Sequence, residues 1–404
     1  MNGLLSVGQA RARLLSGVEP VEAEEARIAA AVGRRLAENV RAPRAQPPQA
    51  LSAMDGYAVR DEDVAAAGAR LTVVGEAPAG GSYDGVVGAG EAVRIFTGGP
   101  VPDGATRIVV QEAARRDGDV ISIAEPQVGG EHIRRRGIDF ETDELLLEAG
   151  EVLSPASCAL AAAANRARVL VRRKPSIGIV ASGDELVEPG GVLEDSHIIN
   201  SAAYGIAALA ERSGCVAALL GVLPDEEAAA ALRLESALGE HSLDVIVAVG
   251  GASVGDRDVM KPVFERIGAR IDFAGVAVRP GKPTWSARID GGPVVLGLPG
   301  NPASALACGY LFLRPLVGAL FGDGAAPAFR SARLAAPVAA NGPRETYLRA
   351  RLSTDEIGAA TVIADARQDS SLLTPFAQAN ALLRRQPDAP AVDVGAEVDV
   401  LPLD

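Results

Sequence analysis

Short apolar runs of strand length alternate with glycine-containing turns between residues 51 and 138. Typical runs are RLTVVGEAP, EAVRIF, ATRIVVQE and DVISIAE, and glycines or Asp-Gly pairs separate them. Runs of this length, rich in Val and Ile and bounded by turn residues, are typical of β-strands. The pattern predicts a small all-β domain, for which we take residues 46–138.

The segments on either side of this β domain have a helical period. SVGQARARLL is expected to form a helix that begins at a Ser6 cap, and EEARIAAAVGRRLAENV a second helix. The prolines of RAPRAQPPQA then end the helical pattern. After the β domain, DELLLEAGEVLSPASCALAAAA predicts a strand and then a helix that begins at Ser154 and Pro155. We assign residues 1–45 and 139–172 to one split linking domain.

The period changes again at residue 173. Continuous apolar strands, PSIGIVASGDEL, CVAALLGVL and DVIVAVGGASVGD, alternate with helices expected over residues 202–212 and 226–238. Strands without polar alternation are buried on both faces, which indicates a parallel α/β sheet over residues 173–322. Residues 323–404 return to short strands and predict a second β domain. The fold class is therefore multidomain α/β plus β, with a central parallel-sheet α/β domain, two small β domains and a split helical/β linking domain.

Composition narrows the functional classes. A chain of 404 residues with 48% hydrophobic residues can bury several cores. Its net charge of -13 argues against nucleic acid as a partner, although local sites can still bind anions. Three isolated cysteines fit a reducing compartment without structural zinc. Because no signal peptide or uninterrupted membrane span stands out, we expect no membrane partner and a cytoplasmic location.

Three glycine-rich turns directly follow predicted strands of the α/β domain, at residues 182–184, 250–255 and 298–301. Ligands of open α/β sheets bind outside the carboxyl ends of the strands, where these turns would lie. Glycines there let backbone N–H groups approach a phosphate ahead of the next helix. Any one of these turns alone could equally be a plain strand-to-helix connection.

Carboxylates are concentrated at the same strand ends: Asp184, Glu185, Asp225, Asp256 and Asp258. Acidic side chains beside a phosphate-binding turn suggest a bridging divalent cation. Helix N-capping is the alternative for each residue taken singly, since caps favour Asp at these places. Their convergence on one edge favours contact with a metal or substrate.

In the first β domain, SAMDGYAVR contains Asp55 and IFTGGPVPDGAT contains Thr97, and as local chemistry both segments are turns. The histidines, His132, His197 and His241, fall in unrelated loops. No Ser/His/Asp or Cys/His arrangement is therefore indicated, which makes acyl-transfer hydrolysis improbable.

Six motifs together carry a resemblance that no single one could carry. SAMDGYAVR, TGGPVPDGATRIVVQE, SGDELVEPG, GGASVGDRDVMKP, RPGKP and LPGNPASA occur in order between residues 51 and 311. The chain thereby resembles the molybdenumtransferase family, which includes bacterial MoeA and the E domain of gephyrin. The tail QDSSLLTPFAQANALLRRQP also resembles the C-terminal signature of that family.

The resemblance implies an enzyme that inserts molybdenum from molybdate into adenylylated molybdopterin and releases AMP, the last step in making molybdenum cofactor. It implies a molybdopterin-binding α/β domain, a divalent cation such as Mg²⁺, and a homodimer whose active site lies between the α/β domain of one subunit and the small β domain of the other. The molybdopterin adenylyltransferase and downstream molybdoenzymes are candidate protein partners.

The same resemblance assigns roles residue by residue, without deciding which of Asp256 and Asp258 is in the site. The residues expected to be catalytic are Asp55, Thr97, Glu185, Asp225, Asp258 and Lys282. The expected metal ligands are Asp55, Glu185, Asp225 and Asp256. The residues expected to bind the pterin substrate are Gly183, Asp184, Gly250, Gly251, Ser253, Gly255, Arg279, Gly281, Pro299, Gly300, Asn301 and Pro302.

Two other functions compete with this one. A molybdopterin adenylyltransferase uses the same α/β domain but is typically that domain alone, so the additional domains argue against it. A non-catalytic molybdopterin carrier would keep the fold and lose the insertion step. The departures from the usual motifs, Gly98-Gly99 and an arginine at Arg279 where lysine is common, leave room for it, because arginine and lysine differ in hydration and hydrogen-bond geometry.

Overall fold

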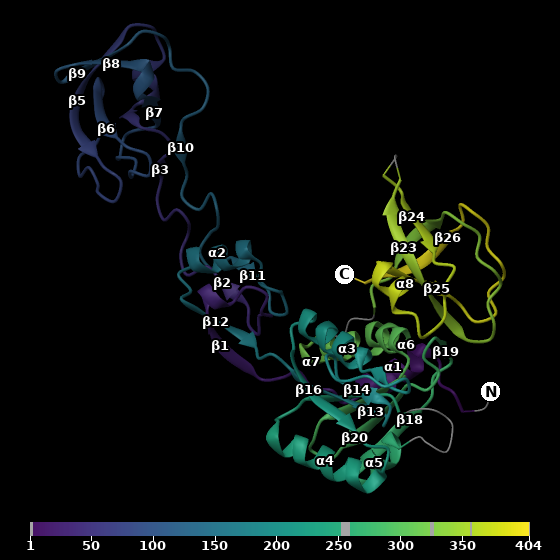
Figure 1. Ribbon diagram of the computed structural model, residues 1–404. Coiled ribbons are helices and arrows are strands. Elements are labelled where there is room, and N and C mark those ends of the chain that lie inside the picture. The colour runs from purple at the N-terminus through teal and green to yellow at the C-terminus, as the bar shows by residue number, and fades with distance from the viewer. Residues whose placement is uncertain (1–2, 252–258, 324–326, 356–357, 404) are drawn as a thin grey trace. The chain divides into compact units, whose positions relative to one another are not determined.

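The computed structural model describes residues 3–251, 259–323, 327–355 and 358–403. The chain divides into two compact units, one formed by Met1–Glu24 with Arg172–Asp404 and the other by Glu25–Val171 (Figure 1).

The all-β domain expected near the start of the chain is confirmed. Its sheet has six strands in the order β7-β4-β6-β5-β9-β8. Alternate residues of β4 face opposite sides, since Tyr57 and Val59 join one buried cluster whereas Ala58 joins another. The strands are β4 (Gly56–Val59), β5 (Ala69–Ala77), β6 (Glu91–Ile95), β7 (Arg107–Val110), β8 (Ala114–Asp117) and β9 (Val120–Ile123).

The prediction of a second N-terminal helix over EEARIAAAVGRRLAENV is wrong. The segment forms β1 (Ala23–Arg27), a 3-10 turn (Ile28–Ala30) and β2 (Val40–Arg41). β1 pairs with β12 (Arg168–Arg172), and β2 pairs with β11 (Leu145–Leu147). Of the segment's apolar residues, Ala31, Leu36 and Val40 are buried in a core shared with these partner strands, whereas Val32 is exposed. Long-range strand pairing therefore overrides the local helical period.

The expected helix at Ser154 is confirmed as α2 (Pro155–Ala163), with the Ser154 side chain accepting from the backbone N–H of Ser157. The first helix is confirmed as α1 (Val7–Leu15), closed by a reciprocal capping box between Ser6 and Gln9. Its buried residues belong to the main core of the α/β part. This first helix therefore packs with the α/β part, although the predicted boundary 1–45 assigns it to the linking domain. The domain boundaries themselves stay a prediction.

The α/β sheet is mixed rather than wholly parallel. Its order is β16-β13-β17-β21-β20-β18; the first four strands are parallel, and β20 runs antiparallel to both of its neighbours, β21 and β18. β20 returns into β21 through a tight turn at Asp290–Gly292, where Gly291 has φ +67°. The strands are β13 (Ser176–Ser182), β16 (Val216–Leu223), β17 (Val245–Val249), β18 (Ala269–Ala274), β20 (Trp285–Ile289) and β21 (Val294–Leu298).

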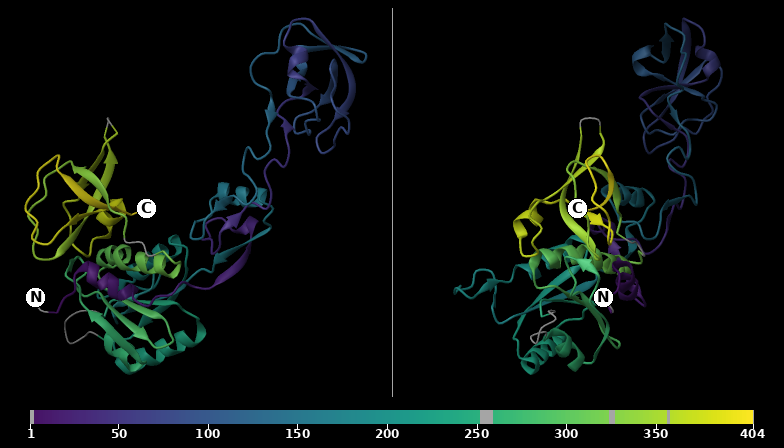
Figure 2. Two further views of the ribbon diagram at one scale, coloured as in Figure 1. Left: turned by 180° about the vertical axis from the view of Figure 1, so that it is seen from behind. Right: turned by 90° about the vertical axis from the view of Figure 1, so that its right-hand side faces the viewer.

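Helices cover both faces of this sheet (Figure 2). α3 (Ser201–Arg212) and α4 (Glu227–Glu240) confirm the two helices expected there, and α5 (Met260–Arg266) packs beside α4. One continuous helix, Pro302–Leu320, is long and apolar enough to span a membrane, yet 78% of it is buried. It comprises α6 (Pro302–Cys308), a π-helical turn (Gly309–Leu313) and α7 (Arg314–Leu320), and it contributes to the core.

The expected C-terminal β domain is also confirmed. Its six-stranded sheet has the order β19-β23-β24-β22-β26-β25. Its first strand, β19 (Val278–Arg279), comes from the α/β part and pairs in parallel with Glu345 and Thr346. The others are β22 (Arg330–Leu334), β23 (Glu345–Thr354), β24 (Ala360–Ala364), β25 (Ala381–Arg385) and β26 (Glu397–Pro402), and α8 (Leu373–Gln378) precedes β25.

Candidate functional site

Three glycine turns meet at the carboxyl ends of β13, β17 and β21. The backbone N–H of Gly250 donates to Leu298 O at 3.1 Å. A Cβ added at Gly250 would lie 3.0 Å from Ser182 O, and one added at Gly300 would lie 3.3 Å from the Gly250 Cα. The predicted convergence of the three turns is confirmed for these residues, whose backbones lie close together.

The turn that contains Arg279, Gly281 and Lys282 lies on the same rim of the sheet. It precedes β20, which runs antiparallel to β21 and pairs Trp285 with Gly297. The start of β20 therefore lies beside the end of β21. Arg279 and Lys282 are exposed there, so two cationic side chains stand at the rim that the glycine turns form.

Asp184 and Asp225 bind each other's backbone at the ends of β13 and β16. The N–H of Asp225 donates to Asp184 Oδ1 at 3.1 Å, and the N–H of Asp184 donates to Asp225 Oδ2 at 3.4 Å. The capping alternative does not hold for Asp225, because Glu226 caps α4 by accepting from Ala228 and Ala229. These two bonds hold the pKa of Glu226 below its usual value. Asp225 therefore does not serve as the cap of α4, and its side chain lies at the rim.

Glu185 lies against Gly183, whose φ is +146°. A Cβ added at Gly183 would lie 2.7 Å from Glu185 Oε2. The turn closes through the N–H of Leu186, which donates to Gly183 O at 3.0 Å. Glycine is thus needed at position 183 for its backbone conformation, whereas the exposed and flexible Glu185 side chain could move aside.

The proposed metal ligands are not gathered by the part of the chain that the structure describes. Within residues 3–251, 259–323, 327–355 and 358–403, no three His, Cys, Asp or Glu side chains form a group that could hold a metal ion. Ser253, Gly255, Asp256 and Asp258 lie outside the described residues. The described carboxylates alone do not fit a complete cation site.

The turn after β21 is joined to the C-terminal β domain. Pro299 is buried and Pro302 is the first residue of α6. Asn301 occupies the N-cap position of α6, but its side chain does not cap the helix. Instead Asn301 Nδ2 donates to Ser370 Oγ at 2.8 Å. Reasoning from the sequence missed Ser370 as a neighbour of the site, although its segment carried part of the resemblance.

Asp55 and Thr97 form a hydrogen-bonded pair in the other compact unit. Asp55 Oδ1 accepts from the backbone N–H of Thr97 at 2.7 Å and from its hydroxyl at 2.8 Å. These two bonds, helped by the charge of Arg94, hold the pKa of Asp55 below its usual value. Both residues are exposed. The pair therefore presents an ionised carboxylate at the surface of its domain.

Arg94, which the sequence did not single out, supports this pair. Its guanidinium lies 5.1 Å from the Tyr57 ring centroid and 4.8 Å from that of Phe96. It donates to Gly56 O at 3.0 Å and to Gln111 Oε1 at 2.8 Å. The pairing of β4 with β6 places Arg94 beside Tyr57, and the pairing of β4 with β7 brings the segment of Gln111 alongside, which explains why local pattern gave no signal.

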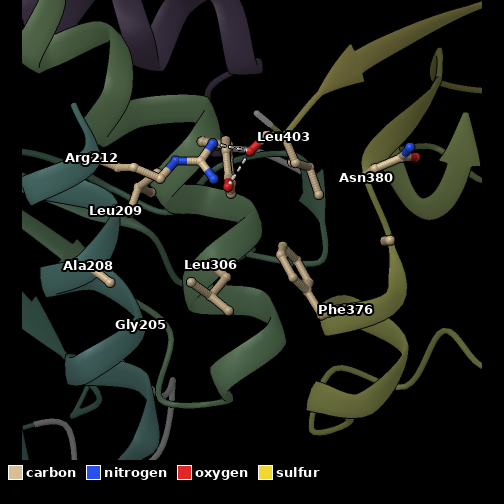
Figure 3. Close-up of a pocket in the computed structure, with 10 residues that line it drawn as sticks. Gly205, Ala208, Leu209, Arg212, Leu306, Phe376, Asn380 and Leu403 are labelled. Carbon is tan, nitrogen blue, oxygen red and sulfur yellow. Dashed lines mark hydrogen bonds between the residues drawn. The ribbon is translucent and has the colours of Figure 1, made fainter.

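A separate cavity of about 370 Å³ lies between α3, α6 and the C-terminal domain (Figure 3). Leu306 and Phe376 point into it. Arg212 and Tyr310 both donate to Leu403 O, at 2.6 and 2.7 Å. None of the rim residues lines this cavity, and its mostly apolar wall does not suit a phosphorylated substrate.

Three family models match the chain in order. They are the MoeA N-terminal region (domains I and II) at residues 5–165, a probable molybdopterin binding domain at 178–319 and the MoeA C-terminal region (domain IV) at 331–403. The second match covers the rim described above. The fold and the rim thus define a multidomain enzyme built around a domain of the molybdopterin-binding type.

Similar proteins agree with this class. Proteins named molybdopterin molybdenumtransferase are 36% identical in a Nostoc species, covering 79% of this chain and 74% of that protein, and 31% identical in Staphylococcus aureus, covering 91% and 88%. A solved molybdopterin biosynthesis MoeA protein of Pyrococcus horikoshii superposes with a TM-score of 0.84 at 30% identity, covering 99% of each chain. The chain belongs to the molybdopterin molybdenumtransferase (MoeA) family and is a transferase.

Proposed function

We propose that the protein inserts molybdenum from molybdate into adenylylated molybdopterin, releasing AMP and forming molybdenum cofactor. The observation that carries the proposal is the meeting of three glycine turns, the Asp184–Asp225 pair and two cationic side chains on one rim of the α/β sheet. Family membership supplies the substrate class.

The rim offers the chemistry that cleavage of a phosphoanhydride requires. Such a cleavage depends on placing the phosphates and stabilising their charge more than on a covalent nucleophile. The exposed backbone of Gly300 would let its N–H group approach a phosphate. Lys282 and Arg279 would stabilise oxyanion charge on molybdate or phosphate. Asp225 and Glu185 would accept hydrogen bonds from the substrate or bind a cation that accompanies it.

A divalent cation, for which Mg²⁺ remains our prediction, would add positive charge near the phosphates when bound. Whether Asp256 or Asp258 completes its ligand set is part of the same prediction. We test this prediction by omitting Mg²⁺ from the assay of AMP release, or by replacing it with Mn²⁺ or Ca²⁺. An unchanged rate in the presence of a chelator would contradict it.

We further propose that the protein acts as a homodimer in which Asp55 and Thr97 serve the site of the partner subunit. Within their own domain, Thr97 and Arg94 act on the Asp55 carboxylate, and the pair stays exposed and ionised. Mixing an Asp55→Ala subunit with a Glu185→Ala subunit should restore part of the activity, because one of the two sites would then be intact. Equal inactivity of the mixture and of the parent variants would contradict a shared site.

The proposed function is tested by incubating the purified protein with adenylylated molybdopterin, molybdate and magnesium. AMP release and reconstitution of a cofactor-free molybdoenzyme are measured together, and both should depend on molybdate. Tight binding of the substrate without AMP release would favour the carrier function instead. Formation of adenylylated molybdopterin from ATP would favour the adenylyltransferase function.

A further inference from the structure

The turn that carries Arg279 and Lys282 rests on two buried side chains that the proposed chemistry does not use. Thr284 and Cys308 are both fully buried. Thr284 follows the turn directly, whereas Cys308 is the last residue of α6. The thiol lies beneath Gly281, since a Cβ added there would lie 2.2 Å from Cys308 Sγ. The turn therefore sits on the sulfur without space between them.

Thr284 binds the turn through both its backbone and its hydroxyl. Its N–H donates to Gly281 O at 3.0 Å, and its Oγ1 donates to the same oxygen at 2.8 Å. Thr284 Oγ1 also lies 3.3 Å from Cys308 Sγ. One hydroxyl proton serves one acceptor at a time, and a carbonyl oxygen is a stronger acceptor than sulfur. The Thr284 hydroxyl therefore donates its hydrogen bond chiefly to Gly281 O.

The Cys308 thiol keeps its proton and can donate a hydrogen bond to the turn or to Thr284. Complete burial raises the pKa of Cys308 to about 12. Its S–H can then donate to Thr284 Oγ1, or to Pro280 O at 3.9 Å. Two backbone bonds fix the ends of the same segment: Val276 N–H donates to Lys282 O and Gly275 N–H donates to Thr284 O, each at 2.9 Å.

We propose that Thr284 and Cys308 are positioning residues that hold the turn in the conformation from which Lys282 and Arg279 bind the molybdate oxyanion. This inference rests on the proposed function, because that function gives the two cations their ligand. The hydroxyl fixes the carbonyl of Gly281, one residue before Lys282, so its loss would let the ammonium group move relative to the rim. Neither Thr284 nor Cys308 touches the ligand.

The experiment measures equilibrium binding of molybdate to the full-length protein, together with its thermal unfolding temperature. Thr284→Val keeps the shape and removes the hydroxyl, and it should weaken molybdate binding by about ten-fold, the equivalent of one hydrogen bond. Thr284→Ser restores the hydroxyl and should restore most of the affinity. Cys308→Ala should weaken binding by a smaller factor, about two- to three-fold, and provides a second test if Thr284→Val does not fold.

Ser286, two residues beyond Thr284 and within β20, offers a matched control. It is also fully buried, and its hydroxyl donates to a backbone carbonyl, Val295 O, at 2.9 Å. Ser286→Ala should lower the unfolding temperature by a few degrees, about as much as Thr284→Val does. It should leave molybdate affinity unchanged, because Val295 lies in the body of the sheet and not in the turn.

The outcomes separate the inference from the proposed function. Weaker molybdate binding in Thr284→Val, recovery in Thr284→Ser and no change in Ser286→Ala support the positioning role. Equal affinity of the wild type and Thr284→Val, or an equal loss in Ser286→Ala, overturns it while leaving the proposed function intact. A wild-type protein that does not bind molybdate counts against the proposed function and removes this inference with it.

Discussion

Asn301 donates a hydrogen bond of 2.8 Å to Ser370 Oγ, across the junction between the α/β domain and the C-terminal β domain. Asn301 belongs to the turn after β21, which is one of the turns that meet at the rim. The loop around Ser370 is in turn held by Arg349, whose guanidinium donates to the carbonyls of Arg367, Asp369 and Leu372. The C-terminal domain thus reaches the proposed site through a defined set of contacts.

This contact predicts a measurable coupling between the two positions. Asn301→Ala and Ser370→Ala should each destabilise the protein slightly, and the double variant by less than their sum, with a coupling of about 0.5 to 1 kcal/mol. Thermal or chemical unfolding of the four proteins of the cycle measures it. Ser371→Ala is the control, because Ser371 binds Asp369 and not Asn301. Additive effects of Asn301→Ala and Ser370→Ala would contradict a functional contact between the residues.

Asp55 should give stability a specific pH dependence. The two bonds from Thr97 lower the pKa of Asp55 below 3.8 in the folded state. A lowered folded-state pKa stabilises the fold above the unfolded pKa, and this stabilisation is lost as the pH falls through the folded value. Asp55→Asn should therefore unfold at a lower temperature than the wild type at neutral pH, and the difference should shrink as the pH falls through the folded-state pKa of Asp55.

Thr97→Val separates the two donors of this pair. It removes the hydroxyl bond to Asp55 Oδ1 and leaves the backbone N–H bond. The pKa of Asp55, followed by NMR of its carboxyl carbon, should rise part of the way toward its ordinary value. A pKa equal to that of the wild type would show that the hydroxyl bond contributes nothing in solution.

Removal of either proposed site carboxylate should abolish catalysis without unfolding the protein. Asp55 and Glu185 are exposed, so neither contributes to an apolar core. Alanine at either position should lower AMP release by about a hundred-fold or more, the scale expected for a lost catalytic group, and change the unfolding temperature by only a few degrees. Full cofactor yield from either variant would remove that residue from the site.

The sequence predicts the α/β elements well because their signals are local. Continuous apolar runs and turn glycines mark β13, β17 and β21, and the carboxyl-end rule for open sheets then places the turns at Gly183, Gly250 and Gly300 on one rim. The mixed character of the sheet was not predicted. β18 (ARIDFA) and β20 (WSARI) alternate apolar and polar residues instead of running continuously apolar, but the direction of β20 depends on connections that composition does not encode.

The predictions that failed share a physical cause: the structure at those positions depends on contacts with residues far away in the sequence. The segment at Ala23–Arg27 has a helical period, yet β12, more than a hundred residues later, captures it as a strand. The residues that support the turn of Arg279 and Lys282 could not be predicted from the sequence either, because Thr284 and Cys308 are 24 residues apart. Only the fold shows that they lie under the same glycine.

Gly281 should tolerate no side chain, and the reason can be divided into two measurable parts. Its φ of +118° is unfavourable for other residues, and an added Cβ would lie 2.2 Å from Cys308 Sγ. Gly281→Ala should therefore destabilise the protein by about 2 to 4 kcal/mol, combining backbone strain and overpacking. Cys308→Ala removes the sulfur, so the double variant should recover the steric part and keep the backbone part, giving effects that do not add. Gly291, which also has positive φ but open space around its Cα, is the control in which alanine imposes backbone strain alone. Equal destabilisation by Gly281→Ala with and without the cysteine would show that the thiol does not press on the turn.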